Sequence, residues 1–97
     1  MFEKLYDENE KVKVRFLGLT TNDTRYDFGV VYTNMFFGKP LVICMQTGRS
    51  TLLGHDDVEN IQHLQQVFRL RSLEEADDLA HFLKFLLPDT PLYAEYE

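Results

Sequence analysis

The histidines and the paired acidic residues are the side chains best suited to chemistry in this sequence. The histidines are His55, His63 and His81. They lack the close spacing that metal sites use, and two of them fall on polar faces of predicted helices. In the pairs Asp56-Asp57 and Asp77-Asp78, adjacent carboxylates on a helix point apart instead of converging on a substrate. Neither a serine nor the single cysteine stands in a nucleophile elbow. The sequence therefore favours a protein that is not an enzyme and has no metal or cofactor.

A small polar loop is the candidate for ligand binding. It consists of Thr47, Gly48, Arg49, Ser50 and Thr51. Hydroxyls, a guanidinium and backbone N–H groups together suit a small anion or a nucleotide phosphate. The loop lacks the glycine-rich stretch followed by Lys-Ser or Lys-Thr that defines a P-loop. A tight hairpin at Gly48 explains the same residues, so a plain turn is the alternative.

A turn rich in apolar residues is the candidate for protein contact. Met35, Phe36 and Phe37 lie between Asn34 and Gly38, at a place where a loop tip is normally polar. Either the loop folds back over the sheet edge and buries these side chains, or they form an exposed patch. An exposed patch would bind a partner protein or a second copy of the chain.

Phe85 is a second apolar residue in an unexpected position. At 100° per residue it falls on the charged face of the last predicted helix. Its cover is either the C-terminal tail, through Leu92, Tyr93 and Tyr96, or another chain.

The charges are unevenly distributed along the chain. Residues 1–54 hold seven basic and six acidic side chains, whereas residues 55–97 hold three basic and ten acidic ones, for a total of −6. A net negative protein repels phosphate backbones, so nucleic acid is an unfavourable partner. The basic stripe Lys11, Lys13 and Arg15 could touch RNA, but it lacks interleaved aromatics and is more typical of a solvated sheet face.

Four strands are predicted to position these residues. Alternation in residues 11–19 predicts a half-buried strand whose apolar side carries Val12, Val14 and Phe16. Strands also follow at residues 25–33, 41–46 and 49–53. Gly29 interrupts the second strand and indicates a bulge there. The continuous apolar run from Leu41 indicates that the third strand is buried on both faces.

Two helices are predicted after the strands. The first covers residues 56–65, with Asp56 as its N-cap. The second covers residues 73–87, because Ser72 and Glu75 fit a capping box and Pro88 stops the helix. Between them, residues 67–71 alternate like a fifth short strand; a longer first helix followed by an αα-turn is the alternative. The predicted class is α+β, an antiparallel sheet of three to five strands covered on one face by two helices.

Size and composition predict one small domain in a reducing compartment. Ninety-seven residues with 44% hydrophobic content suffice for one core, with short flexible ends at about residues 1–8 and 89–97. Cys44 is the single cysteine and reads as an inert core residue. The sequence shows no secretory signal and no apolar stretch of about 18 residues, so we expect a cytoplasmic location.

The run YDFGVVYTNMFFGKPLVICMQTGRSTLL, with FRLRSLEEADDL after it, resembles a small family of uncharacterised cytosolic proteins from Bacillus-type Gram-positive bacteria. The resemblance extends along the whole chain and implies a compact α+β domain. It supplies no active residues. The sequence thus predicts a non-catalytic, self-associating protein-interaction module, with anion binding as the alternative.

Overall fold

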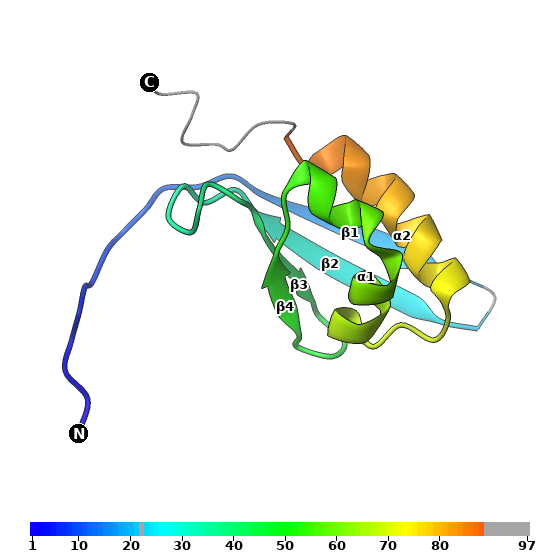
Figure 1. Ribbon diagram of the computed structural model, residues 1–97, viewed down its shortest axis with the longest axis horizontal. Coiled ribbons are helices and arrows are strands. Elements are labelled where there is room, and N and C mark those ends of the chain that lie inside the picture. Colours follow the sequence, from blue (N-terminus) through cyan, green and yellow to red (C-terminus); the bar gives the residue numbers. More distant parts are fainter. Residues whose placement is uncertain (22, 89–97) are drawn as a thin grey trace.

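A four-stranded sheet and two helices form the molecule in the computed structural model, which describes residues 1–21 and 23–88 (Figure 1). The strands are β1 (Val14–Thr20), β2 (Arg25–Val31), β3 (Leu41–Cys44) and β4 (Ser50–Leu52). The 3₁₀ helix η1 (His55–Glu59) and the helices α1 (Ile61–Phe68) and α2 (Leu73–Leu86) follow. The predicted α+β class is confirmed.

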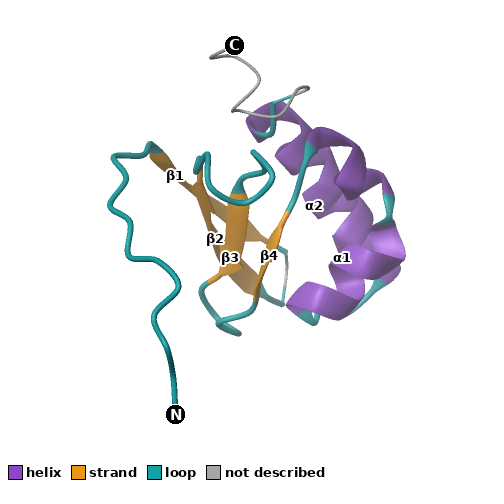
Figure 2. Cartoon of the chain, turned by 60° about the vertical axis from the view of Figure 1, so that its left-hand side comes forward, coloured by secondary structure: helices purple, strands orange, loops and turns teal. Residues whose placement is uncertain are grey.

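The sheet is a meander in which each strand pairs antiparallel with the next, in the order β1-β2-β3-β4. Short turns connect β1 to β2 and β3 to β4, and a longer loop, residues 32–40, connects β2 to β3. Antiparallel neighbours need no crossover, so connections of this length suffice. Gly48, with a φ of +73°, makes the tight turn between β3 and β4 possible. Both helices lie on one face of this sheet, and none of the described helices lies over the other face (Figure 2).

The predicted orientation of the first strand is wrong. Val14 and Phe16 point to the uncovered face, and Phe16 is 77% exposed. Leu17 and Leu19 point to the helices and pack against the core. Apolar residues occupy both faces of β1, so alternation alone could not decide which set is buried.

The third strand and Gly29 also differ from the prediction. β3 ends at Cys44, and only Val42 and Cys44 are buried, while Ile43 is half-buried; the strand is covered on one face only. Gly29 pairs in register with Phe16 and Ile43, so β2 has no bulge there. A side chain at position 29 would collide with Met45, since a Cβ would lie 2.9 Å from its terminal methyl. The glycine therefore permits a close approach instead of a bulge.

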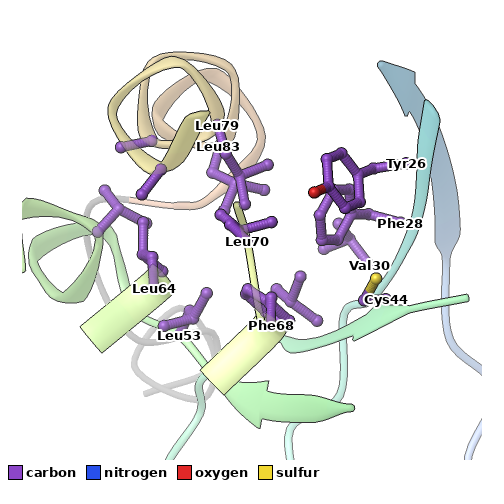
Figure 3. Close-up of a cluster of buried hydrophobic side chains, with 14 of the residues drawn as sticks. Tyr26, Phe28, Val30, Cys44, Leu53, Leu64, Phe68, Leu70, Leu79 and Leu83 are labelled. Atoms are coloured by element: carbon purple, nitrogen blue, oxygen red, sulfur yellow. The ribbon is translucent and has the colours of Figure 1, made fainter. Parts of the chain in front are cut away.

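The core lies between the covered face and the helices (Figure 3). Phe28 is 1% exposed and packs edge-on against Phe68 of α1, with ring centroids 5.3 Å apart. Leu64 and Phe68 from α1 and Leu79 and Leu83 from α2 complete the centre. Full burial of such a side chain contributes about 1.5–3 kcal/mol, so this layer supplies most of the stabilisation.

The first predicted helix is divided in two. Residues 55–59 form η1, and α1 begins after Asn60, whose side chain accepts a hydrogen bond from the His63 N–H (3.1 Å). Asp56 is thus not the N-cap of the α-helix. Asp57 instead accepts from the Gly54 N–H at 2.6 Å and from Lys39 Nζ at 2.9 Å, and so fixes the entry into η1.

The predicted fifth strand is wrong, and the alternative of a longer helix is right. Residues 67 and 68 belong to α1, and Arg69 takes a left-handed conformation with φ +55° that ends the helix. Leu70 is then buried against the core in the turn to α2. The apparent alternation of Phe68 and Leu70 arose because a helix end and its αα-turn bury both residues.

The last helix follows the prediction to within one residue at its end. Ser72 Oγ accepts from the Glu75 N–H at 3.1 Å, as a capping residue should. In a capping box the Glu75 carboxylate would accept from the Ser72 N–H. It accepts instead from the Arg71 N–H, one residue earlier, at 2.9 Å. No described helix is long and apolar enough to cross a membrane. The expected cover of Phe85 by the tail and the expected mobility of residues 89–97 fall outside the described residues.

Candidate interaction surfaces

The uncovered face of the sheet, called the open face below, consists of the outward side chains of the four strands. Across all four strands, the register arranges them in two rows: Val14, Val31, Leu41 and Leu52; then Phe16, Gly29, Ile43 and Ser50. All but the glycine and the serine of these two rows are apolar. On β1 and β2 the face continues with Gly18 beside Asp27 and Thr20 beside Arg25. Antiparallel sheets with one solvated face normally alternate apolar and polar residues, so an apolar outer face is unusual.

Phe16 and Met45 are the most prominent side chains of the open face. Both lie over Gly29: a Cβ there would stand 2.9 Å from Met45 Cε and 3.5 Å from a Phe16 ring carbon. They cover the glycine backbone yet remain exposed, Phe16 to 77% and Met45 to 48%. The open face therefore has a raised apolar centre and not a cleft.

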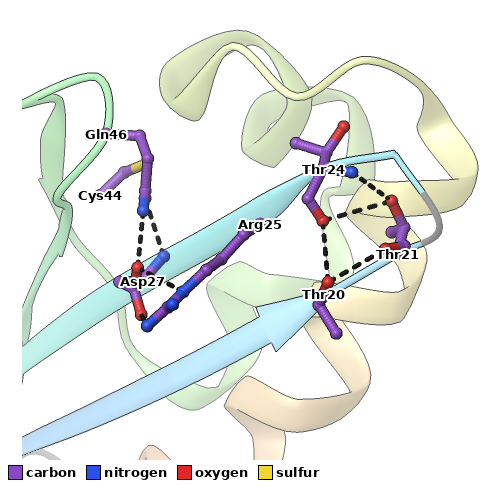
Figure 4. A network of polar contacts seen from close by, with 7 residues as sticks. All are labelled: Thr20, Thr21, Thr24, Arg25, Asp27, Cys44 and Gln46. Carbon is purple, nitrogen blue, oxygen red and sulfur yellow. Dashed lines mark hydrogen bonds and ion pairs between the residues drawn. The ribbon is translucent and has the colours of Figure 1, made fainter.

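A polar network borders this centre (Figure 4). The Asp27 carboxylate accepts from Arg25 Nε at 3.1 Å and from Gln46 Nε2 at 2.7 Å, while the Asp27 N–H donates to Gln46 Oε1 at 2.8 Å. The hydrogen bonds from Arg25 and Gln46 hold the pKa of Asp27 below its usual range. This group is an ion pair between Arg25 and Asp27, extended by Gln46.

The predicted aromatic loop lies at the surface. Met35, Phe36 and Phe37 are all exposed, and Phe37 is 76% exposed with a φ of +59°. A left-handed backbone is uncommon for a bulky residue and turns the ring outward. Phe85 on α2 is 84% exposed. The structure thus leaves all four predicted contact residues accessible, but their use as an interface stays a prediction.

The predicted anion loop behaves as a hairpin turn. The Gly48 N–H donates to the Cys44 carbonyl at 2.8 Å, and the Arg49 N–H donates to Thr47 Oγ1 at 3.2 Å. Two N–H groups that an anion would use are therefore engaged within the turn. Ser50 and Thr51 belong to β4. Anion binding stays a prediction, and this geometry gives it little support.

A hollow of about 140 Å³ lies between the β1-β2 hairpin and α2. Leu19, Phe28, Leu79 and other apolar side chains line most of it. Polar side chains also line it, among them Tyr26, whose hydroxyl donates to Glu75 Oε1 at 3.0 Å. Burial, and then this bond, raise the pKa of Tyr26. Tyr26 and Glu75 are already bonded to each other, and Asp78 is the other carboxylate at this hollow. No group of His, Cys, Asp and Glu among the described residues could hold a metal ion.

The N-terminal arm, residues 1–10, is an additional exposed region. All ten residues are exposed, including Phe2, Leu5 and Tyr6. Glu10 fixes the base of the arm, because its carboxylate accepts from Thr33 Oγ1 at 2.5 Å and from the Asn34 N–H at 2.8 Å. These two hydrogen bonds lower the pKa of Glu10. The arm projects on the side of the sheet opposite the helices (Figure 2).

Sequence reasoning missed the open face and the arm. The signal for the open face was present, because residues 41–45 are apolar at the odd-numbered and at the even-numbered positions, which point to opposite faces of a sheet. That run was interpreted as a strand buried on both sides, although it equally fits a sheet with one covered and one open apolar face. For the arm, the sparse anchors Phe2, Leu5 and Tyr6 indicated only a flexible end.

Comparison with known families identifies the chain's relatives. A family profile described as SAV0927-like matches residues 5–85, which include every strand and helix except the last residue of α2. The chain belongs to the SAV0927-like family. This is an uncharacterised family, as the resemblance implied. A search of curated proteins finds no match to the chain. Membership in the SAV0927-like family thus agrees with the α+β fold and assigns no activity.

Proposed function

We propose that this SAV0927-like protein is a non-catalytic interaction module that associates with a second copy of itself through the open face. The observation that carries the proposal is the pair of apolar rows across all four strands, with Phe16 and Met45 raised above Gly29. Apolar surface of this kind is stabilised by removal from water. A cytoplasmic location is part of the proposal, and it is supported by the single cysteine, which is free and buried.

Charge distribution favours a second copy meeting sheet to sheet. Residues 1–54, which form the sheet, carry seven basic and six acidic side chains. Residues 55–88, which form the helical side, carry three basic and seven acidic ones. Two copies that meet through their open faces keep the acidic helical sides apart, whereas contact between helices would bring like charges together.

Sedimentation velocity of matched variants tests the proposal. Phe16→Asp should convert a dimer to a folded monomer, because a carboxylate at the centre of the interface would be desolvated without a partner. Phe85→Asp, at an equally exposed phenylalanine on α2, is the control and should leave the dimer intact.

The double variant Phe36→Asp/Phe37→Asp separates the open face from the aromatic loop. If this variant alone dissociates the dimer, self-association stands but the loop is its surface. A wild-type protein that remains monomeric at every concentration, with native circular dichroism, would exclude self-association.

A further inference from the structure

The arm carries an extended backbone without a partner. Within the described chain, no backbone N–H or carbonyl of residues 1–10 forms a hydrogen bond with another segment. Phe2 and Leu5 are almost fully exposed, and Tyr6 is largely exposed. An extended segment of this kind is what a free sheet edge binds, because main-chain hydrogen bonds supply affinity and alternate side chains supply specificity.

The outer edge of β1 is such a free edge. β1 is the first strand in the sheet order, and β2 is its neighbour on one side only. The Tyr32 N–H donates to the Lys13 carbonyl at 3.0 Å, which sets the phase of the hydrogen bonds. Lys13, Arg15, Leu17 and Leu19 therefore bond toward β2, and the backbone groups of the even-numbered residues 14–20 point outward. β1 has no proline and no bulge, and no segment among residues 1–21 and 23–88 pairs with its outer edge.

The arm cannot reach the β1 edge of its own protomer without breaking contacts at its base. Glu10 is bonded to Thr33 and Asn34, and Lys13 is bonded to Tyr32. Residues 10–13 therefore run alongside residues 32–34 and cannot form the turn of a hairpin. The arm also leaves on the open-face side (Figure 2), which is the side on which the second copy would lie.

We propose that the arm of one copy adds as an antiparallel strand to the β1 edge of a second copy. This inference rests on the self-association proposed above. One register is favoured by its side chains: Tyr6 opposite Phe16, Asp7 opposite Arg15 and Leu5 opposite Leu17. Directly opposed residues share a face, so this register gives an aromatic pair, an ion pair and an apolar pair. Shifting it by two residues replaces the aromatic pair with Glu8 or Lys4 opposite Phe16.

The size of the interface also calls for the arm. Four strands about 4.8 Å apart and some five residues long give an open face of about 300 Å² per copy. Two such faces bury about 600 Å², less than the roughly 1,200–2,000 Å² of a stable interface. Each aromatic side chain adds about 150–250 Å², so Phe2 and Tyr6 from both arms bring the total into that range.

Disulfide trapping tests the register. A chain with Tyr6→Cys is mixed with a chain with Phe16→Cys under mild oxidation, and the disulfide-linked product is measured by mass. Cys44 is buried, and repeating the experiment with Cys44→Ala excludes its participation. Facing residues of paired strands suit disulfide geometry. We expect several-fold more linked dimer than with the control Lys4→Cys, which places the thiol two residues away on the same side of the arm.

Three outcomes would overturn the arm proposal. They are equal yields for the two arm positions, no linked product, and an internal disulfide when both cysteines are placed in one chain. The last outcome would mean that the arm folds onto its own β1.

Sedimentation of Phe2→Ser/Tyr6→Ser separates this inference from self-association. If that variant dissociates, the arm proposal is supported. A variant that stays dimeric overturns the arm proposal and leaves self-association standing. A monomeric wild type overturns both.

Discussion

The two faces of the sheet are built from similar residues but differ in what covers them. On the covered face, Phe28 is 1% exposed and packs against α1. On the open face, Phe16 is 77% exposed and lies over a glycine. Residue type alone therefore does not specify the core. The helices decide which apolar set becomes the core, and the other set remains available for a second chain.

The pair Phe28→Ala and Phe16→Ala gives the largest expected contrast between the faces. Phe28→Ala should lower the free energy of unfolding by about 3–5 kcal/mol, because it removes a fully packed ring. Phe16→Ala should change the stability of the monomer by less than about 0.5 kcal/mol. Urea denaturation at low protein concentration measures both values. Similar losses for the two variants would show that the open face is covered within one protomer.

Asp57 and Asp27, which both hold neighbouring side chains by hydrogen bonds, give a smaller contrast in stability. Asp57→Ala should cost about 1 kcal/mol, because Asp57 caps the Gly54 N–H and pairs with Lys39 in a half-exposed setting. Asp27→Asn, on the open face, should cost far less, because its partners remain in water. Thermal denaturation at neutral pH compares the two variants, and an Asp27 effect as large as that of Asp57 would contradict this difference.

The pH dependence of the Asp57 contribution follows from the same contacts. Burial raises the pKa of Asp57, but the hydrogen bonds from Gly54 and Lys39 outweigh it and leave the pKa lowered. The stabilisation is therefore complete above the unfolded-state pKa of about 3.9 and is lost as the pH falls through the lower folded-state value. Asp57→Ala should therefore reduce the loss of unfolding free energy that accompanies a fall to acid pH, and urea denaturation across acid pH values measures this acid part of the stability curve. An unchanged acid part would show that Asp57 contributes no pH dependence.

Gly29→Ala tests the contact between Gly29 and Met45 on the open face, and its expected effect is small. The new methyl would meet Met45 Cε at 2.9 Å, and the flexible methionine can move aside. We expect a loss below about 1 kcal/mol that Met45→Ala relieves in the double variant. Chemical denaturation of the double-mutant cycle measures the coupling. Additive effects would show that Met45 does not lie over Gly29 in solution.

Sequence patterns predicted those parts of the fold that local chemistry determines. The turn at Gly48, the loop around Asn34 and the Ser72 cap of α2 each had a local cause, and each is confirmed. The prediction of which side of β1 is buried was wrong, because both sides carry apolar residues: Val14 and Phe16 on one, Leu17 and Leu19 on the other. The position of the helices decides which side is covered. The prediction of a strand at residues 67–71 was wrong, because the end of a helix can bury Phe68 and Leu70 just as a strand would.

The candidate contact surface was predicted only in part. Met35, Phe36 and Phe37 are exposed, as one of the two alternatives for the loop required. Phe85 is exposed as well, but the choice between the tail and another chain as its cover stays a prediction. The open face was not predicted, because its rows are joined by strand register, which depends on pairing between distant residues. The arm was not predicted either, since its base is fixed by Glu10 across 23 positions of sequence.

Sedimentation equilibrium of the wild-type protein across a range of concentrations tests the central claim most directly. A face that is apolar because a second copy covers it predicts a mass that rises toward twice the 11.4 kDa of the chain. A constant mass of one chain at all concentrations, from a folded sample, would contradict the account.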